Sequence, residues 1–185
     1  MGPRKQQEIF DATLRLVAER GYDGLTVEGV AERSGVNKTT IYRWWPSKAA
    51  LLGAALVEAD VLGFEPPDTG SLRGDLVALV EGVVRLLTEP PARDVVVAAL
   101  GAAVRHPDLD ARAFFADRFA RERQIFERAA RRGEPAAADP MLVVDLLAGA
   151  VWLRAVFRGL PLDDDFASRA VSAVLDGVRA PAAAP

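Results

Sequence analysis

Three residues at fixed spacing constrain this chain more than any other feature of its sequence. Ala31, Gly35 and Ile41 follow the pattern Ala-x3-Gly-x5-Ile. Two short helices that cross at a steep angle need a small residue where they touch and a residue that tolerates a left-handed backbone in the turn. They also need an apolar plug on the second helix. The spacing therefore predicts a helix-turn-helix over residues 27–45, with its second helix free to lie in a major groove of DNA.

The residues around this motif are suited to begin and end short helices. Thr26 can cap the first helix of the pair, and Ser47 can cap the helix that follows the motif. Gly21 ends a longer helix that begins near residue 4, and Pro46 ends the second helix of the motif. The N-terminal segment is therefore predicted to be a three-helix head.

The rest of the chain shows no convincing strand pattern, and its Gly and Pro residues cluster at intervals that suit connections between helices. We predict an all-α fold of about nine helices. We predict a helix-turn-helix domain at 1–47, a helical domain for dimerisation and effector binding at 48–179, and a disordered tail at 180–185. Beyond the head, the expected helices cover residues 48–62, 71–88, 91–105, 109–132, 140–158 and 163–178.

Composition excludes several classes of function. The chain has no cysteine and a single histidine, and it contains no nucleophile elbow and no phosphate-binding glycine loop. We therefore expect no enzyme, no metal site and no cofactor. The N-terminus lacks the apolar run of a signal peptide. The most apolar stretch, 141–157, is interrupted by Asp145 and Arg154, so we expect no membrane association and a cytoplasmic protein.

Charge is distributed unevenly along the chain. The net charge is −3, yet the first 50 residues carry eight Lys or Arg against six Asp or Glu. Residues 33–48 hold four basic residues and no acidic one. Such a local basic segment is expected of a small phosphate-contacting surface. Charge alone would fit a solvated helix face equally well.

The tract from Gly21 to Leu52 resembles the DNA-binding region of the tetracycline-repressor (TetR) family. It reads GYDGLTVEGVAERSGVNKTTIYRWWPSKAALL, and the match is specific over about residues 5–52. Trp44 and Trp45 stand where the family often has histidine and phenylalanine. The resemblance implies a three-helix head on a helical body, acting as a homodimer on a palindromic operator.

Chemistry and resemblance together assign the predicted DNA contacts. The start of the recognition helix reads base edges in this motif, and basic or aromatic residues farther along hold phosphates or bases. Residues at helix N-termini meet phosphates. The predicted DNA-binding residues are Thr26, Lys38, Thr39, Thr40, Tyr42, Arg43, Trp44 and Lys48. Tyr42 and Trp44 have packing against the first helix as an alternative, Thr26 has a purely capping role, and Trp45 is assigned to the core.

The apolar helices near the C-terminus predict a subunit interface. The helix at 140–158 is hydrophobic on nearly every face, and the last helix offers a matching stripe. Pairing of both with their symmetry mates would make an isologous four-helix interface. One large monomer core is the alternative. The predicted interface residues are Leu146, Ala150, Leu153, Phe157, Val171, Val174, Leu175 and Val178.

Aromatic residues in the middle helices, with a few polar groups, suggest a pocket for a small apolar or aromatic effector. Ordinary core packing would look the same. Arg154 would bind a ligand carboxylate or phenol, or an acid across the dimer. The predicted ligand-binding residues are His106, Phe115, Phe119, Trp152 and Arg154.

The sequence thus predicts a homodimeric transcriptional regulator that binds double-stranded DNA, with release from its operator by a small-molecule effector. A repressor is favoured over an activator. The alternative is a helical protein-interaction module without sequence-specific DNA binding.

Overall fold

The computed structural model describes residues 3–58, 65–107, 109, 111–135 and 139–177, with the backbone alone at 3–4 and 111–117. The predicted tail at 180–185 lies outside these residues. All of the regular structure in the described residues is helical, which confirms the all-α prediction. The helices are α1 (Pro3–Arg20), α2 (Val27–Ser34), α3 (Lys38–Trp44), α4 (Lys48–Glu58), α5 (Leu72–Thr88), α6 (Ala92–Arg105), α7 (Ala111–Arg131), α8 (Pro140–Trp152) and α9 (Phe166–Leu175).

The chain divides into two compact units. The first contains α1–α4, α6 and the start of α7. In it α1 packs against α2, α4 and α6, because α1 buries Ile9, Phe10 and Val17 on one side. Residue 47, where the sequence predicts a domain boundary, lies inside this unit, since α4 and α6 contribute to the same core.

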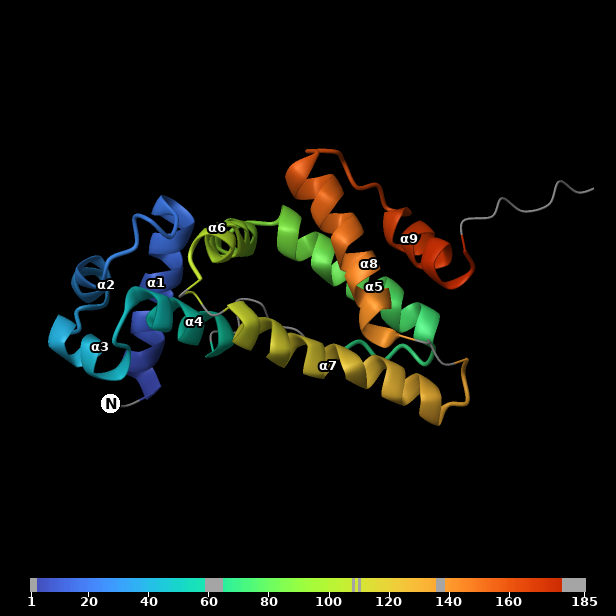
Figure 1. The fold of residues 1–185 in the computed structure, drawn as a ribbon, viewed down its shortest axis with the longest axis horizontal. Helices are drawn as coiled ribbons and strands as arrows, with labels where there is room; N and C mark the ends of the chain where they lie inside the picture. The colour runs from blue at the N-terminus through green and yellow to red at the C-terminus, as the bar shows by residue number, and fades with distance from the viewer. Residues whose placement is uncertain (1–2, 59–64, 108, 110, 136–138, 178–185) are drawn as a thin grey trace, which may run out of the picture. The chain divides into compact units, whose positions relative to one another are not determined.

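The second unit contains α5, most of α7, α8 and α9. In this unit α5 contacts both α8 and α9, and α8 contacts α9 (Figure 1). Its buried residues include Leu76 on α5, Leu147 and Val151 on α8, and Phe166 on α9.

The helix predicted at 140–158 is not α-helical over its whole length. Its α-helical part stops at Trp152, and Leu153–Phe157 form a π-helical turn. The N–H of Arg158 donates to the carbonyl of Leu153 at 2.9 Å, which closes the wider ring. The chain then reverses at Gly159, whose φ of +58° is in the left-handed region. π-helical turns inside or at the end of α-helices occur frequently at functional sites.

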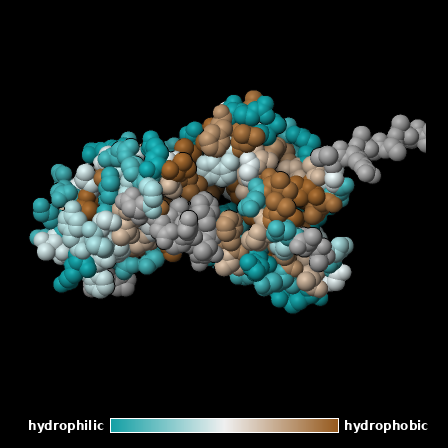
Figure 2. Space-filling view, viewed as in Figure 1, coloured by the Kyte–Doolittle hydropathy of each residue, from teal (hydrophilic) through white to brown (hydrophobic). Residues whose placement is uncertain are grey.

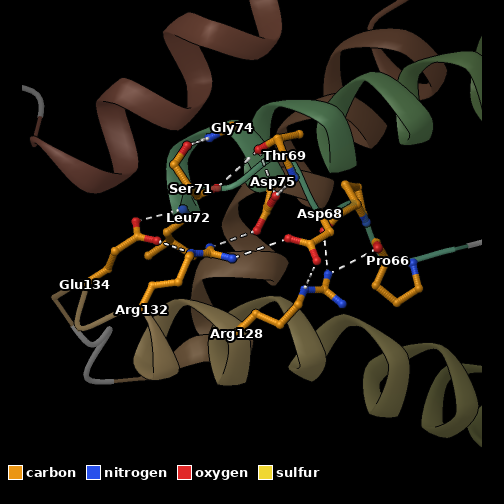
Figure 3. Close-up of polar contacts among 11 residues, drawn as sticks. Pro66, Asp68, Thr69, Ser71, Leu72, Gly74, Asp75, Arg128, Arg132 and Glu134 are labelled. Atoms are coloured by element: carbon orange, nitrogen blue, oxygen red, sulfur yellow. Dashed lines mark hydrogen bonds and ion pairs between the residues drawn. The ribbon is translucent and has the colours of Figure 1, made fainter.

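A polar network around the buried Asp75 holds the start of α5 to the end of α7 (Figure 3). The carboxylate of Asp75 is fully buried and accepts hydrogen bonds from the N–H and hydroxyl of Thr69, at 2.6 and 2.8 Å. The guanidinium of Arg132 donates to the other oxygen of Asp75 at 3.1 Å and to Glu134 at 2.7 Å. Glu134 in turn accepts from the N–H of Leu72 at 2.8 Å. The hydrogen bond from Leu72, and then that from Arg132, hold the pKa of Glu134 below its usual value.

The same network fixes the loop before α5. The guanidinium of Arg128 donates to the carbonyl of Pro66 at 3.1 Å and also to that of Pro67 (Figure 3). It lies 3.7 Å from the carboxylate of Asp68. Backbone carbonyls outside regular secondary structure need other donors, and here a side chain on a neighbouring helix supplies them. Arg128 does this for the loop that leads into the second unit.

Candidate nucleic-acid interface

Local hydrogen bonds and one glycine set the angle between α2 and α3. The hydroxyl of Thr26 accepts a hydrogen bond from the N–H of Gly29 at 3.1 Å and begins α2. Gly35 ends α2 with a φ of +67°. The side chain of Asn37 then accepts from the N–H of Thr39 at 2.9 Å and begins α3. The predicted helix-turn-helix is confirmed, and so is the capping role of Thr26.

Apolar residues behind the turn hold α3 against the unit. Val30 and Ile41 are fully buried, and Val36 is nearly so. The ring of Trp45 meets that of Phe10 edge-on, with 5.2 Å between centroids and 62° between planes. Trp45 is half-buried against the core, as the sequence predicted. Because α3 is fixed on this side, its opposite side is presented to solvent.

The outer side of α3 carries most of the predicted DNA contacts. Lys38, Thr39 and Arg43 are exposed and Thr40 is half-buried. The two aromatic side chains are also exposed, with Tyr42 at 42% and Trp44 at 52% of their full area. Neither is packed away against α1, so both rings remain available to a partner.

The cations of the basic stretch differ in how they are engaged. The guanidinium of Arg33 makes two hydrogen bonds to the carboxylate of Glu19, at 2.7 and 2.9 Å. These bonds hold the pKa of Glu19 below its usual value and raise that of Arg33. Lys38 lies 3.8 Å from the carboxylate of Glu28. Arg43 makes no hydrogen bond or ion pair within the part of the chain that the structure describes. Arg43 is therefore the cation of α3 most ready to meet a phosphate.

Lys48 has a structural partner that the sequence does not reveal. Its ammonium donates to the carbonyl of Tyr22 at 2.9 Å and lies 4.4 Å from the centroid of the Tyr22 ring. The single histidine, His106, directly follows α6 and packs against the same ring with 4.8 Å between centroids. Its Nε2 lies 3.0 Å from the carboxylate of Asp23. Tyr22 is 26 residues from Lys48, and Asp23 is 83 residues from His106. No local sequence pattern could have shown these contacts.

The predicted ligand-binding residues fall in two places. His106 belongs to the first unit, whereas Phe119, Trp152 and Arg154 belong to the second. Phe119 and Trp152 are half-buried, and the guanidinium of Arg154 lies 5.4 Å from the centroid of the Phe166 ring. The side chain of Phe115 lies outside the described residues.

A hollow of about 330 Å³ opens beside α7 in the second unit, lined in part by Leu72, Phe126 and Pro140. None of the predicted ligand-binding residues with described side chains lines it. No group of three or more His, Asp and Glu side chains among the described residues is placed to hold a metal ion.

The predicted interface residues differ in exposure. Leu146 and Leu153 are exposed at 53% and 54%, and Phe157 at 76%. Ala150, Val174 and Leu175 are half-buried. Val171 is fully buried within its own chain, and Val178 lies outside the described residues. In Figure 2 a hydrophobic patch lies over the region of α8 and α9 in the second unit.

Two family models match this chain. Residues 9–55 match "Bacterial regulatory proteins, tetR family". Residues 66–174 match "Tetracyclin repressor-like, C-terminal domain". The first match contains the whole helix-turn-helix, and together the two span most of the chain.

Curated relatives cover nearly the full length. An uncharacterised helix-turn-helix transcriptional regulator of Mycobacterium tuberculosis is 36% identical over 181 residues, which are 96% of this chain and 87% of the relative. A DNA-binding transcriptional repressor TetR of Mycobacteroides abscessus is 34% identical over 185 residues, covering 94% of this chain and 93% of the relative.

Solved structures have the same fold. The TetR family transcription regulator SCO0332 superposes with a TM-score of 0.76 at 34% identity, covering 95% of this chain and 99% of that one. The regulator FadR from Bacillus subtilis, solved in complex with stearoyl-CoA, has a TM-score of 0.67 at 17% identity, covering 94% and 99% of the two chains. The helix-turn-helix, both family models and the relatives all agree: this chain belongs to the TetR family of bacterial DNA-binding transcriptional regulators, which are not enzymes.

Proposed function

We propose that this regulator is a homodimeric repressor that binds a palindromic operator in the cytoplasm and leaves it when a small apolar effector binds. The observation that carries the proposal is the outer side of α3. Exposed Tyr42, Arg43 and Trp44 stand on a helix whose other side is fixed by the buried Ile41. Rigid backing of this kind keeps base-contacting side chains at a defined position in the major groove.

The contacts on α3 divide into two roles. Lys38, Thr39 and Thr40 begin the helix and are assigned to base edges, with hydroxyl and ammonium groups that suit purine acceptors. Arg43 and Trp44 are assigned to the DNA backbone, because a guanidinium and an indole N–H both donate to phosphate. Tyr42 lies between them and can serve either role. Thr26 and Lys48 are assigned at most supporting contacts, since the Thr26 hydroxyl and the Lys48 ammonium already have partners.

Dimerisation is supported by the unpartnered face of α8. The stretch Pro140–Phe157 is long and apolar enough to cross a membrane, but Val144, Leu147 and Val151 are buried in the second unit. Its opposite face carries exposed Leu146 and Phe157. An exposed apolar face beside a packed one is typical of a subunit interface. We assign Leu146, Ala150, Leu153, Phe157, Val174 and Leu175 to the partner face and leave Val171 in the chain's own core.

Introduction of charge on this face would test the dimer. Leu153→Asp and Phe157→Asp place a charge where the partner's apolar face is proposed to lie. Both should convert the dimer to monomer in sedimentation velocity experiments. Val104→Asp is the matched control, because Val104 is 87% exposed on α6 and outside the proposed interface. A wild-type monomer, or variants that dimerise as well as wild type, would contradict this part of the proposal.

The effector is assigned to the second unit, where Phe119, Trp152 and Arg154 supply apolar surface and one cation. FadR, which shares the fold, was solved with stearoyl-CoA. An apolar chain with an anionic head would suit the same combination in this chain. Binding can release DNA only if the effector binds the released state more tightly than the DNA-bound one. Addition of stearoyl-CoA and of shorter acyl-CoA molecules to the protein–DNA complex tests this class directly.

Selection of bound fragments from random duplex DNA tests the function as a whole. A palindromic consensus is expected, with half-site centres about 34–36 Å apart or a multiple of that distance. No enrichment from a folded dimeric protein would overturn the proposal and favour a protein-interaction module.

A further inference from the structure

An acidic side chain lies at the edge of the proposed DNA-binding surface. Glu28 is in the first turn of α2, and its Oε1 is 3.8 Å from the ammonium of Lys38 in the first turn of α3. The two side chains are 59% and 60% exposed. Because Lys38 belongs to the outer side of α3, Glu28 is placed beside the same surface. A carboxylate in this position faces a polyanion whenever DNA is bound.

Glu28 in the first turn of α2 interacts favourably with the helix dipole, but at so exposed a site this stabilises the helix only modestly. The first turn of α2 is already capped by the hydroxyl of Thr26, and an ion pair this exposed contributes little to folding. Near phosphates, the negative charge of Glu28 weakens binding to any DNA unless a hydrogen-bond donor meets it. A cost of this kind raises specificity when one particular sequence removes it.

The major-groove edge of a C·G base pair offers what both side chains need. The cytosine N4 amino group is a donor and fits the carboxylate of Glu28. The guanine O6 and N7 atoms are acceptors and fit the ammonium of Lys38. Each of the other base pairs presents its donors and acceptors in a different order across the major groove. The adjacent carboxylate and ammonium therefore form a pattern complementary to one base pair.

We propose that Glu28 is a specificity-determining residue that, together with Lys38, selects a C·G base pair at one position of each operator half-site. This inference rests on the proposed function of α3. Glu28 lowers affinity for DNA that lacks the cytosine amino group there. It thereby widens the gap between operator and non-specific DNA, which is the quantity that matters against a genome of competing sites.

The test compares fragment selection by the wild type with selection by Glu28→Ala, Glu28→Gln and the control Glu32→Gln. Glu32 is also exposed on α2 but is one turn farther along the helix. With Glu28→Ala, the preference for C·G at one position per half-site should fall at least about fivefold, with other positions unchanged. Glu28→Gln should move that position toward A·T, because an amide pairs with adenine N6 and N7. Both variants should bind random duplex DNA more tightly than the wild type, whereas Glu32→Gln should keep the wild-type consensus.

The outcomes separate this inference from the proposed function. If the wild type selects no sequence, the proposed function fails. If the wild type selects a palindrome and Glu28→Ala keeps the same base preference at every position, the assignment of Glu28 is wrong. Lys38→Ala gives a second reading, because it should weaken the preference at the same base pair. Loss of preference at a different position would also overturn the pairing of the two residues. The melting temperature of each variant should stay close to that of the wild type, because the substituted residues are exposed. This control shows that the fold is kept.

Discussion

Sequence alone cannot say whether Lys48 contacts a phosphate or makes a structural hydrogen bond, and a substitution can separate these two roles. Replacement by Met keeps the apolar stem and removes the charge. In the structure the ammonium donates to the Tyr22 carbonyl at 2.9 Å, and a hydrogen bond from a charged group contributes about 1.5–3 kcal/mol. Its place over the Tyr22 ring adds about 0.5–1 kcal/mol at a partly exposed site. Because Lys48 is half-buried, we take the lower part of this range, about 2 kcal/mol.

That destabilisation should be visible as a fall in melting temperature of about 4–8 °C for a chain of this length. The slope of log K against log salt for operator binding should stay close to the wild-type value. Arg43→Met is the matched comparison, since Arg43 is exposed on α3. It should leave the melting temperature unchanged and reduce the slope by about 0.9 for each phosphate that the variant no longer neutralises. An unchanged melting temperature for Lys48→Met, with a slope reduced like that of Arg43→Met, would refute the structural role and restore the phosphate contact.

Three further predictions concern stability. Ile41→Ala removes a fully buried side chain behind the recognition helix and should cost about 2–5 kcal/mol in urea unfolding; a cost below about 1 kcal/mol would mean that α3 is not held by this side chain. Asp75→Ala leaves the Thr69 N–H without its buried carboxylate acceptor and should cost about 1.5–3 kcal/mol, whereas wild-type stability would show that the network is dispensable. The Leu72 N–H and Arg132 lower the folded-state pKa of Glu134, so its contribution to stability is present above the ordinary unfolded-state pKa and is lost as pH falls through the lowered folded-state pKa. Glu134→Gln should therefore flatten the acid side of the stability profile, and an unchanged profile would contradict this.

The head of this protein could be predicted because its determinants are local. The cap at Thr26, the left-handed turn at Gly35 and the plug at Ile41 each act within a few residues of the sequence. Local rules of this kind apply to any chain with the same spacing. The exposure of Tyr42 and Trp44 follows from the same periodicity.

The hydrogen-bond partners of the cations could not be predicted, because these partners are distant in the sequence. Composition places Arg33, Lys38 and Lys48 in one basic stretch, yet Arg33 is neutralised by Glu19 on α1 and Lys48 is bonded to the backbone of Tyr22. An amphipathic pattern shows that a helix buries one face, without showing what covers it. For the same reason, no pattern in the sequence indicated that α4 and α6 would share the core of the head.

The shared core has a consequence for the construction of hybrid regulators. The simplest exchange of DNA-binding heads between relatives would join the two chains between the motif and the body. Here a cut after residue 47 would divide a continuous apolar core, because Leu51 and Leu52 of α4 and Ala99 and Ala102 of α6 are buried with α1. A graft that keeps its own α1 must therefore bring along matching surfaces on α4 and α6, or accept voids and clashes between these helices. Recombination would succeed more readily between chains that agree at these buried positions than between chains that agree only in the recognition helix.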